Sequence, residues 1–339
     1  MISLKEIKKA LDKSENPLIF FDDDPDGLCS YLLFMKYLKK GNGIIVKNSP
    51  VLDETYAVKV RQYAPDVVLI LDKPIVSQEF IDKMHVPVYW IDHHPIVDVK
   101  GVNYFNPRFE DDNDNRPTTY WSYQCVKGEK WIALIGIISD WSLESFDELK
   151  KDYKDLFENV KIKNPDDALF DTEFGKLISI ISFNLKGMIG DTYKFIDLFM
   201  KVKTPYEILN KETDIAKKIY EKYEKIYKPY MKHFEKAMEL KDEEVIVYTY
   251  ADGKWSFSRN LANELLHRTK CKLLIIGRYD NGEVKGSMSN RADGINLTNT
   301  VKRSLKGLDG YGGGHVHACG FCIKERDFNK FVERIKKAV

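Results

Sequence analysis

Apolar and amphipathic segments alternate along the first 140 residues of the chain. Four segments have the length and apolar character of strands: 17–23, 43–48, 66–72 and 86–92. Three segments between them repeat apolar residues at helical spacing: 26–41, 54–65 and 77–85. Strands that are apolar throughout and are separated by helices are typical of a parallel sheet with helices on both faces. Residues 1–145 are therefore predicted to form a doubly wound α/β domain.

The remainder of the chain has two further parts. Residues 146–240 are predicted to be a helical extension, ending in a connector helix that Pro229 kinks. The tyrosines of this helix pack against a neighbour or offer a platform for stacked bases. Residues 241–339 alternate strand and helix again and are predicted to be a smaller α/β domain that binds substrate. The predicted fold class is thus α/β throughout, with a helical connector.

Three local segments carry more specific expectations. Residues 130–142, KWIALIGIISDWS, are a buried helix or a buried strand, because periodicity alone does not separate the two. Thr118 and Thr119 follow Pro117 and are predicted to be N-cap residues. The glycine-rich stretch at 307–323 is a tight turn before a buried strand, or a segment where backbone approaches a ligand closely.

Charge is nearly balanced, with 53 Lys plus Arg against 52 Asp plus Glu. It is uneven along the chain, because residues 241–339 contain 18 basic and 12 acidic side chains. This split either reflects an N-terminal part that holds cations and a C-terminal part that meets an anion, or it is chance. A near-neutral chain without an added nucleic-acid-binding module favours short substrates, or a protein partner that supplies the grip on longer ones.

The sequence contains no apolar run near the ~20 residues that span a membrane, and residues 1–16 are amphipathic rather than signal-like. The five cysteines are scattered and odd in number, which is typical of a reducing compartment. We therefore expect a cytoplasmic protein. Cys319 and Cys322 have the spacing of metal ligands, but no second cysteine pair completes a zinc site.

Acidic residues and histidines follow successive apolar segments. They are Asp22, Asp24 and Asp26 after the first segment, Asp72 after the third, Asp92, His93 and His94 after the fourth, and Asp140 after the segment at 130–139. Each feature has an ordinary explanation by itself, since a lone Asp caps a helix and DPDG forms a turn. Together they predict a metal centre, because the carboxyl ends of parallel strands meet in one crevice. Carboxylates with imidazoles favour manganese, magnesium or iron over a thiolate-bound metal, and so many acids suggest two cations about 3.5–4 Å apart.

These motifs resemble the DHH phosphoesterase superfamily along most of the chain. Its signature is H-x-D-x-D-G, a lone Asp after a strand, D-H-H, a fourth Asp and, in the C-terminal domain, G-G-G-H-x-x-A-x-G. Here the segments read DDDPDG, LILD, IDHHP, GIISD and GGGHVHACG. The resemblance is to RecJ-like and oligoribonuclease-type members, and the wording ISDWS and DKP is most similar to archaeal RecJ-like proteins.

The resemblance implies roles for individual residues. Asp22, Asp24, Asp26, Asp72, His93 and Asp140 would ligate two divalent cations, Mn²⁺ or alternatively Mg²⁺, with Asp72 bridging them. His94 would act with Asp72 in catalysis, beside the scissile phosphate, and Asp92 would support the histidines by hydrogen bonding. Arg291, Gly312, Gly313, Gly314 and His315 would bind the substrate phosphate across an interdomain cleft. Asp22 departs from the pattern, because the family has histidine at that position.

Three functions are consistent with these observations. The leading hypothesis is a two-metal exonuclease or oligonucleotidase, which releases nucleoside monophosphates from single-stranded DNA or RNA. The second is a phosphoesterase for a small nucleotide, such as 3′-phosphoadenosine phosphate or a cyclic dinucleotide. The third is a non-catalytic scaffold in a replication or RNA-processing complex, which the substitution at Asp22 suggests. We expect a nucleic-acid or oligonucleotide partner and no membrane association.

Overall fold

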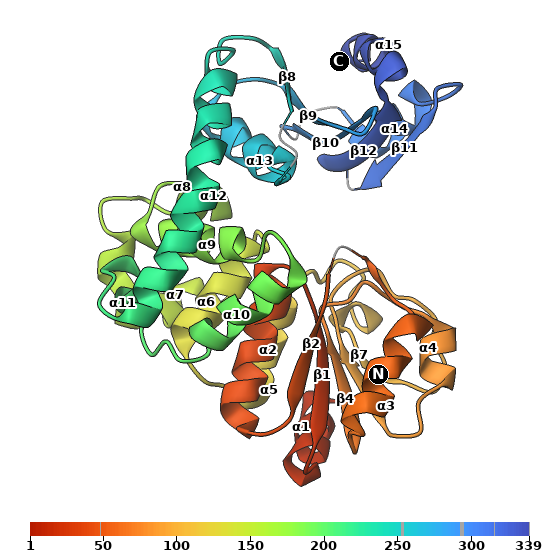
Figure 1. The fold of residues 1–339 in the computed structure, drawn as a ribbon, viewed down its shortest axis with the longest axis vertical. Coiled ribbons are helices and arrows are strands. Elements are labelled where there is room, and N and C mark those ends of the chain that lie inside the picture. The colour runs from red at the N-terminus through yellow and green to blue at the C-terminus, as the bar shows by residue number, and fades with distance from the viewer. Residues whose placement is uncertain (48, 252–253, 292–294, 315, 339) are drawn as a thin grey trace. The chain divides into compact units, whose positions relative to one another are not determined.

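The computed structural model describes residues 1–47, 49–251, 254–291, 295–314 and 316–338. The chain forms two compact units, Met1–Glu221 and Lys222–Val339 (Figure 1). Among the described residues, no helix is both long and apolar enough to cross a membrane.

The first unit is built on a parallel sheet of five strands. Their order across the sheet is β2-β1-β4-β6-β7. The strands are β1 (Pro17–Asp22), β2 (Asn42–Val46), β4 (Val67–Leu71), β6 (Val88–Ile91) and β7 (Asn103–Phe105). The chain runs outward from β1 to β2 and then returns to β4 on the other side of β1. The sheet therefore reverses its winding between β1 and β4, the point at which such sheets bind ligands.

Helices cover both faces of this sheet, as the sequence predicts (Figure 1). On one face α2 (Pro25–Leu38) packs against α5 (Thr118–Val126) and α6 (Lys130–Ser139), and α1 (Leu4–Lys13) packs on α5. On the other face lie α3 (Ala57–Tyr63) and α4 (Gln78–Asp82). Here the rings of Phe20 and Phe80 meet edge to face, with Trp90 in the same buried cluster. A separate two-stranded parallel sheet consists of β3 (Val51–Leu52) and β5 (Ile75–Val76).

The middle of the chain is helical. It contains α7 (Phe146–Leu149), α8 (Pro165–Phe170), α9 (Glu173–Asn184), α10 (Ile189–Phe199) and α11 (Pro205–Leu209). Three 3-10 helices also occur in the first unit, η1 (Glu54–Tyr56), η2 (Pro107–Phe109) and η3 (Lys150–Phe157). The long helix α12 (Asp214–Met238) runs on into the second unit with Pro229 inside it. Tyr223 and Tyr230 of this helix are buried, which favours packing over base stacking for these two rings.

The second unit contains a mixed sheet in the order β11-β12-β10-β9-β8. Among the described residues of this sheet, only β8 and β9 pair in parallel, and the other neighbours are antiparallel. The strands are β8 (Val245–Tyr250), β9 (Leu273–Asp280), β10 (Glu283–Asn290), β11 (Gly310–Gly314) and β12 (Ala318–Lys324). The helices are α13 (Ser258–Arg268), α14 (Leu297–Ser304) and α15 (Glu325–Lys336). Phe321, Phe328 and Phe331 form part of the core between the sheet and α15.

The structure decides the three local expectations. Residues 130–139 are a helix, α6, so Asp140 follows a helix rather than a strand. The N-cap of α5 is Pro117, so the prediction that Thr118 and Thr119 are caps is wrong; both lie in the first helical turn. Gly310–Gly314 is not a turn, because it pairs with β12, the strand that follows it, as strand β11. This pairing explains the difference, since glycine has no intrinsic preference for strands. Close approach of a ligand to this backbone stays a prediction.

Candidate metal centre

Three strand ends bring acidic residues to the same edge of the parallel sheet. In the register, Phe21 pairs with Leu71 and Leu71 pairs with Ile91. The residues that come next in the three strands, Asp22, Asp72 and Asp92, therefore stand at the same level. The edge is the carboxyl end of the sheet on both sides of the point where its winding reverses, where ligands are expected.

Asp24 and Asp26 lie at the start of α2 and have different environments. Asp24 is the N-cap of α2, and its carboxylate accepts a hydrogen bond from the amide of Gly27 at 3.0 Å. Asp26 is buried and accepts from the amides of Thr118 at 2.9 Å and Thr119 at 2.7 Å. These two amides open α5, and the N-terminus of a helix stabilises a negative charge. The backbone amides of Thr118 and Thr119 thus hold the carboxylate of Asp26.

Asp72 is buried at the centre of the cluster. Its φ of 58° is in the left-handed region, which Asp tolerates better than most residues. Its amide donates to the carbonyl of Ile91 at 3.0 Å, and its Oδ1 accepts from the hydroxyl of Thr118 at 3.0 Å. The backbone and the side chain of Asp72 are therefore both held in place by neighbouring elements.

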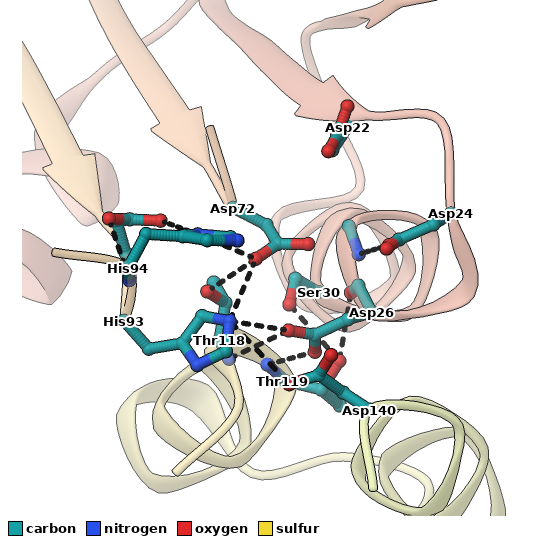
Figure 2. Close-up of polar contacts among 12 residues, drawn as sticks. Asp22, Asp24, Asp26, Ser30, Asp72, His93, His94, Thr118, Thr119 and Asp140 are labelled. Carbon is teal, nitrogen blue, oxygen red and sulfur yellow. Dashed lines mark hydrogen bonds and ion pairs between the residues drawn. The ribbon is translucent and has the colours of Figure 1, made fainter. Parts of the chain in front are cut away.

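His93 directs one ring nitrogen at three carboxylates. Its Nδ1 lies 3.2 Å from the carbonyl oxygen of Asn115. Because a carbonyl only accepts, Nδ1 carries the proton, and in a neutral ring Nε2 is then an acceptor. Nε2 lies 3.6 Å from Asp72, 3.5 Å from Asp140 and 4.0 Å from Asp26 (Figure 2). This tautomer suits Nε2 for binding a metal ion.

His94 is held by Asp92, which is fully buried. Asp92 accepts from His94 Nδ1 at 2.7 Å and from the His94 amide at 3.0 Å. Tyr104 and Asn106 also donate to Asp92, at 3.1 Å and 3.3 Å. The ring of His94 is therefore oriented through Nδ1, while the described residues provide no hydrogen bond to its Nε2.

Asp22 forms an ion pair inside the site. Its Oδ1 accepts from Lys73 Nζ at 2.8 Å and from the amide of Asp23 at 2.9 Å. Lys73 directly follows Asp72, and its side chain has no exposed surface. The nearby Lys47 lies 3.7 Å from Asp23 and donates to the carbonyl of Leu185.

The crowded acids shift the proton affinities of the site. Burial, and next the charge of Asp24, raise the pKa of Asp22 to about 6, although Lys73 opposes this. Burial and the other acids raise the pKa of Asp72 well above its usual range. Burial also raises the pKa of Asp26, against the opposing charge of His93. Burial alone would lower the pKa of His94, but the hydrogen bond to Asp92 and the charge of Asp92 outweigh it and raise that pKa.

The donor atoms fall into groups that fit divalent cations. Asp22, Asp24 and Asp72 each offer one ligand atom within 4.8 Å of the others, and we call them the Asp22 triad. Asp26, His93 and Asp140 do the same and are called the Asp140 triad; a third group combines Asp72 with both histidines. Ligands on opposite sides of Mg²⁺ are about 4.2 Å apart, twice a bond of ~2.1 Å. The spacing, the oxygen and imidazole donors, and the unbalanced negative charge therefore all fit such an ion.

The predicted substrate residues lie in the second unit. Arg291 donates to the carbonyls of Cys271, Leu266 and Thr269, and so satisfies carbonyl groups at the end of α13 and after it. A Cβ at Gly312 or Gly314 would lie under 3.0 Å from backbone of β12, whereas a Cβ at Gly313 would meet nothing within 4 Å. His315 lies outside the described residues. Cys319 and Cys322 contact different side chains, Thr298 and Glu283, and join no potential metal group among the described residues.

Family models match both units of the chain. Residues 16–140 match the N-terminal domain of the DHH family, and residues 242–339 match the DHHA1 domain. The chain belongs to the DHH superfamily of phosphoesterases. No curated protein matches this DHH-family chain in sequence.

Solved structures share the fold of this DHH-family chain. RecJ from Thermus thermophilus, solved with Mn²⁺ and with Mg²⁺, gives TM-scores of 0.70 and 0.64 at 16% identity, over 98% of this chain and 54% and 52% of RecJ. Another exonuclease RecJ bound to manganese gives 0.59 at 14% identity, over 99% and 94% of the two chains. The pGpG-specific phosphodiesterase PggH from Vibrio cholerae gives 0.54 at 14% identity, over 96% and 100%. The chain thus spans about half of Thermus RecJ and nearly all of the other two.

Sequence reasoning missed several residues that build the DHH site. Lys73 was visible only as part of the DKP wording, and nothing in that wording shows that its ammonium reaches back to Asp22. Tyr104 and Asn106, which hold Asp92, have no motif of their own. The sequence did indicate a helix start at Thr118, and the amides at a helix start can bind an anion. This signal could have pointed to the bonds that Thr118 and Thr119 donate to Asp26.

Proposed function

We propose that this chain is a metal-dependent phosphodiesterase that acts as a single-strand exonuclease or oligonucleotidase and releases nucleoside monophosphates from DNA or RNA. The observation that carries the proposal is the convergence of two adjacent groups of metal-type ligands, the Asp22 triad and the Asp140 triad, at one edge of the sheet. Two cation positions that share a neighbouring carboxylate are the arrangement used for in-line hydrolysis of phosphate esters.

The Asp22 triad would hold one divalent cation and the Asp140 triad the other. Asp72 belongs to the first triad and also lies 3.6 Å from His93 Nε2, which supports the proposal that it would bridge the two cations. Mn²⁺ is the proposed ion and Mg²⁺ the alternative, since carboxylate with imidazole suits either. When bound, such cations lower the pKa of a water molecule and neutralise phosphoryl oxygens.

The surrounding residues orient the side chain of His94 and hold that of Asp26. Asp92 fixes the ring of His94 through Nδ1, which leaves Nε2 to donate to a phosphoryl oxygen or to move a proton. The amides of Thr118 and Thr119 hold Asp26 without taking a ligand position themselves. A carboxylate held in this way needs little reorganisation when substrate arrives.

The second unit is proposed to bind the phosphate of the substrate. The open space at Gly313 lets a ligand approach its backbone closely. Arg291 uses Nε and Nη2 on carbonyls, so any phosphate contact would come from Nη1. His315 remains a predicted donor in the same stretch.

Hydrolysis of a short dinucleotide is the second candidate. The fold matches the pGpG-specific phosphodiesterase of Vibrio cholerae over the full length of that chain. The near-neutral charge of the present chain also suits a short substrate better than a long polyanion.

The experiment uses 5′- and 3′-labelled DNA and RNA oligomers of graded length, down to dinucleotides, with Mn²⁺. Asp72→Asn and His94→Ala should abolish mononucleotide release, whereas Asp98→Asn, which removes one exposed charge, should not. The labels then give the direction of degradation. Cleavage of dinucleotides alone would favour the second candidate. Intact substrates at every length, with Mn²⁺ bound, would refute both candidates and favour the scaffold.

A further inference from the structure

Lys73 is a buried cation within a site built to hold cations. Its side chain has no exposed surface, and its Nζ donates to Asp22 Oδ1 at 2.8 Å and to the carbonyl of Ser49 at 2.6 Å. Its own carbonyl accepts from the indole of Trp90 at 3.1 Å. A buried ammonium is costly unless it is paired, so this lysine is committed to Asp22.

The ion pair occupies only one side of the Asp22 carboxylate. Lys73 and the amide of Asp23 both contact Oδ1, and the described residues provide no hydrogen bond to Oδ2. Asp22 also offers an oxygen to the Asp22 triad. The same side chain can therefore pair with Lys73 through one oxygen and face a metal ion with the other.

Lys73 changes the net charge that surrounds an ion in the Asp22 triad. When ionised, the three carboxylates of the Asp22 triad carry three negative charges, and the ammonium of Lys73 reduces the total to two. This total matches one divalent cation, and it equals that of a triad in which a neutral ligand replaces Asp22. The fixed ammonium also repels a divalent ion bound to Asp22, because it lies one carboxylate away.

Resting on the proposed metal centre, we propose that Lys73 is a positioning residue that sets the affinity of the Asp22 triad for its cation. It orients Asp22 and neutralises it, so that the pair acts as one uncharged oxygen donor. Lys73 thereby keeps the ion of the Asp22 triad more weakly held than three unopposed carboxylates would. It does not affect the Asp140 triad, in which α5 holds Asp26 and the Asn115 carbonyl holds His93.

The test is a calorimetric titration of the full chain with Mn²⁺ alone, at about pH 8 so that the carboxylates are ionised. Asp22→Asn should weaken one binding step and so identify the Asp22 triad. Lys73→Met should tighten that same step by about tenfold or more, because the removal of a repulsive charge outweighs the loss of one hydrogen bond to Asp22. Tightening separates this role from structural damage, which only weakens binding. Lys47→Met is the matched control, since its partner Asp23 belongs to no triad.

Lys73→Met alone leaves Asp22 without its partner and could fail to fold. The double variant Asp22→Asn/Lys73→Met removes both charges of the ion pair and keeps the inference testable in that case. The double variant should bind the ion of the Asp22 triad with near wild-type affinity, because the total charge around that ion is the same as in the wild type. It should bind this ion more tightly than Asp22→Asn does, because Asp22→Asn keeps the ammonium of Lys73. Unchanged or weaker binding in both Lys73 variants, relative to their parents, would overturn the inference. If the wild-type chain binds no Mn²⁺, the proposed function itself fails, and the two failures are thus distinguishable.

Discussion

The hydroxyl of Thr118 allows a sharp test of how the centre is held. Thr118 is fully buried, and its Oγ1 donates to Asp72 Oδ1 at 3.0 Å. Thr118→Val keeps the shape and the β-branching but removes the donor. The amide of residue 118, which donates to Asp26, is unchanged. The substitution therefore isolates one hydrogen bond to the carboxylate that is proposed to bridge the cations.

Two magnitudes follow from this contact. A buried acceptor that loses its donor costs about 1–3 kcal/mol, so Thr118→Val should lower the free energy of unfolding by that amount. Removing a hydrogen-bond partner of a metal ligand lowers metal affinity by about 10–100-fold. Thr118→Ser is the matched control, because it keeps the hydroxyl and loses only a methyl group, worth about 0.8 kcal/mol.

The assays are urea unfolding of the metal-free protein and calorimetric titration with Mn²⁺. We expect both variants to be less stable, but only Thr118→Val to bind Mn²⁺ weakly. Wild-type affinity in Thr118→Val would refute the reasoning that the Thr118 hydroxyl orients Asp72. Equal loss of affinity in Thr118→Ser would point to packing instead of the hydrogen bond.

Three further predictions concern the same unit. Asp92→Asn should reduce turnover by about 10–100-fold at unchanged Mn²⁺ affinity, because His94 loses its charged partner; Tyr104→Phe, which removes one neutral donor, should change turnover far less, and equal losses would contradict the argument. Chelation should lower the melting temperature and Mn²⁺ should restore it, with a larger shift at pH 7.5 than at pH 5.5. The sign follows from the pKa of Asp22, which is about 6 in the metal-free fold and therefore higher than in the unfolded chain. The metal-free protein thus loses stability as the pH rises toward and through 6. Above that pH Asp22 is ionised, and Mn²⁺ then binds best. A shift that is independent of pH would argue against this linkage. Burial alone would raise the pKa of Asp66, but hydrogen bonds from the hydroxyl of Ser14 and the amides of Glu15 and Asn16 outweigh it and hold that pKa below the usual value. Its contribution is thus present above the unfolded pKa and is lost as pH falls through the folded one, so Asp66→Asn should destabilise the protein in urea at neutral pH but not at pH 2; an equal effect at both would contradict it.

The order of the elements could be predicted from the sequence because most of them are local. The strands at 17–23 and 66–72 and the helix at 26–41 were each visible in the period of their apolar residues, and β1, β4 and α2 occupy those segments. The glycine stretch was not predictable in the same way. Gly310–Gly314 is extended because β12 pairs with it, and a segment whose one side chain is that of Tyr311 has no periodic pattern to reveal the pairing.

The metal-binding chemistry of this chain is specified locally, by residue types at the ends of apolar segments. Asp22 ends such a strand and Asp72 and Asp92 follow two others, and a parallel sheet brings these positions to one edge. The balance of their charges depends instead on contacts that form in the folded protein. The amides of α5 reach Asp26 from more than 90 residues away, and the ammonium of Lys73 reaches Asp22 across 51 residues. Charge compensation depends on distances in space, and the order of residues along the chain does not specify those distances.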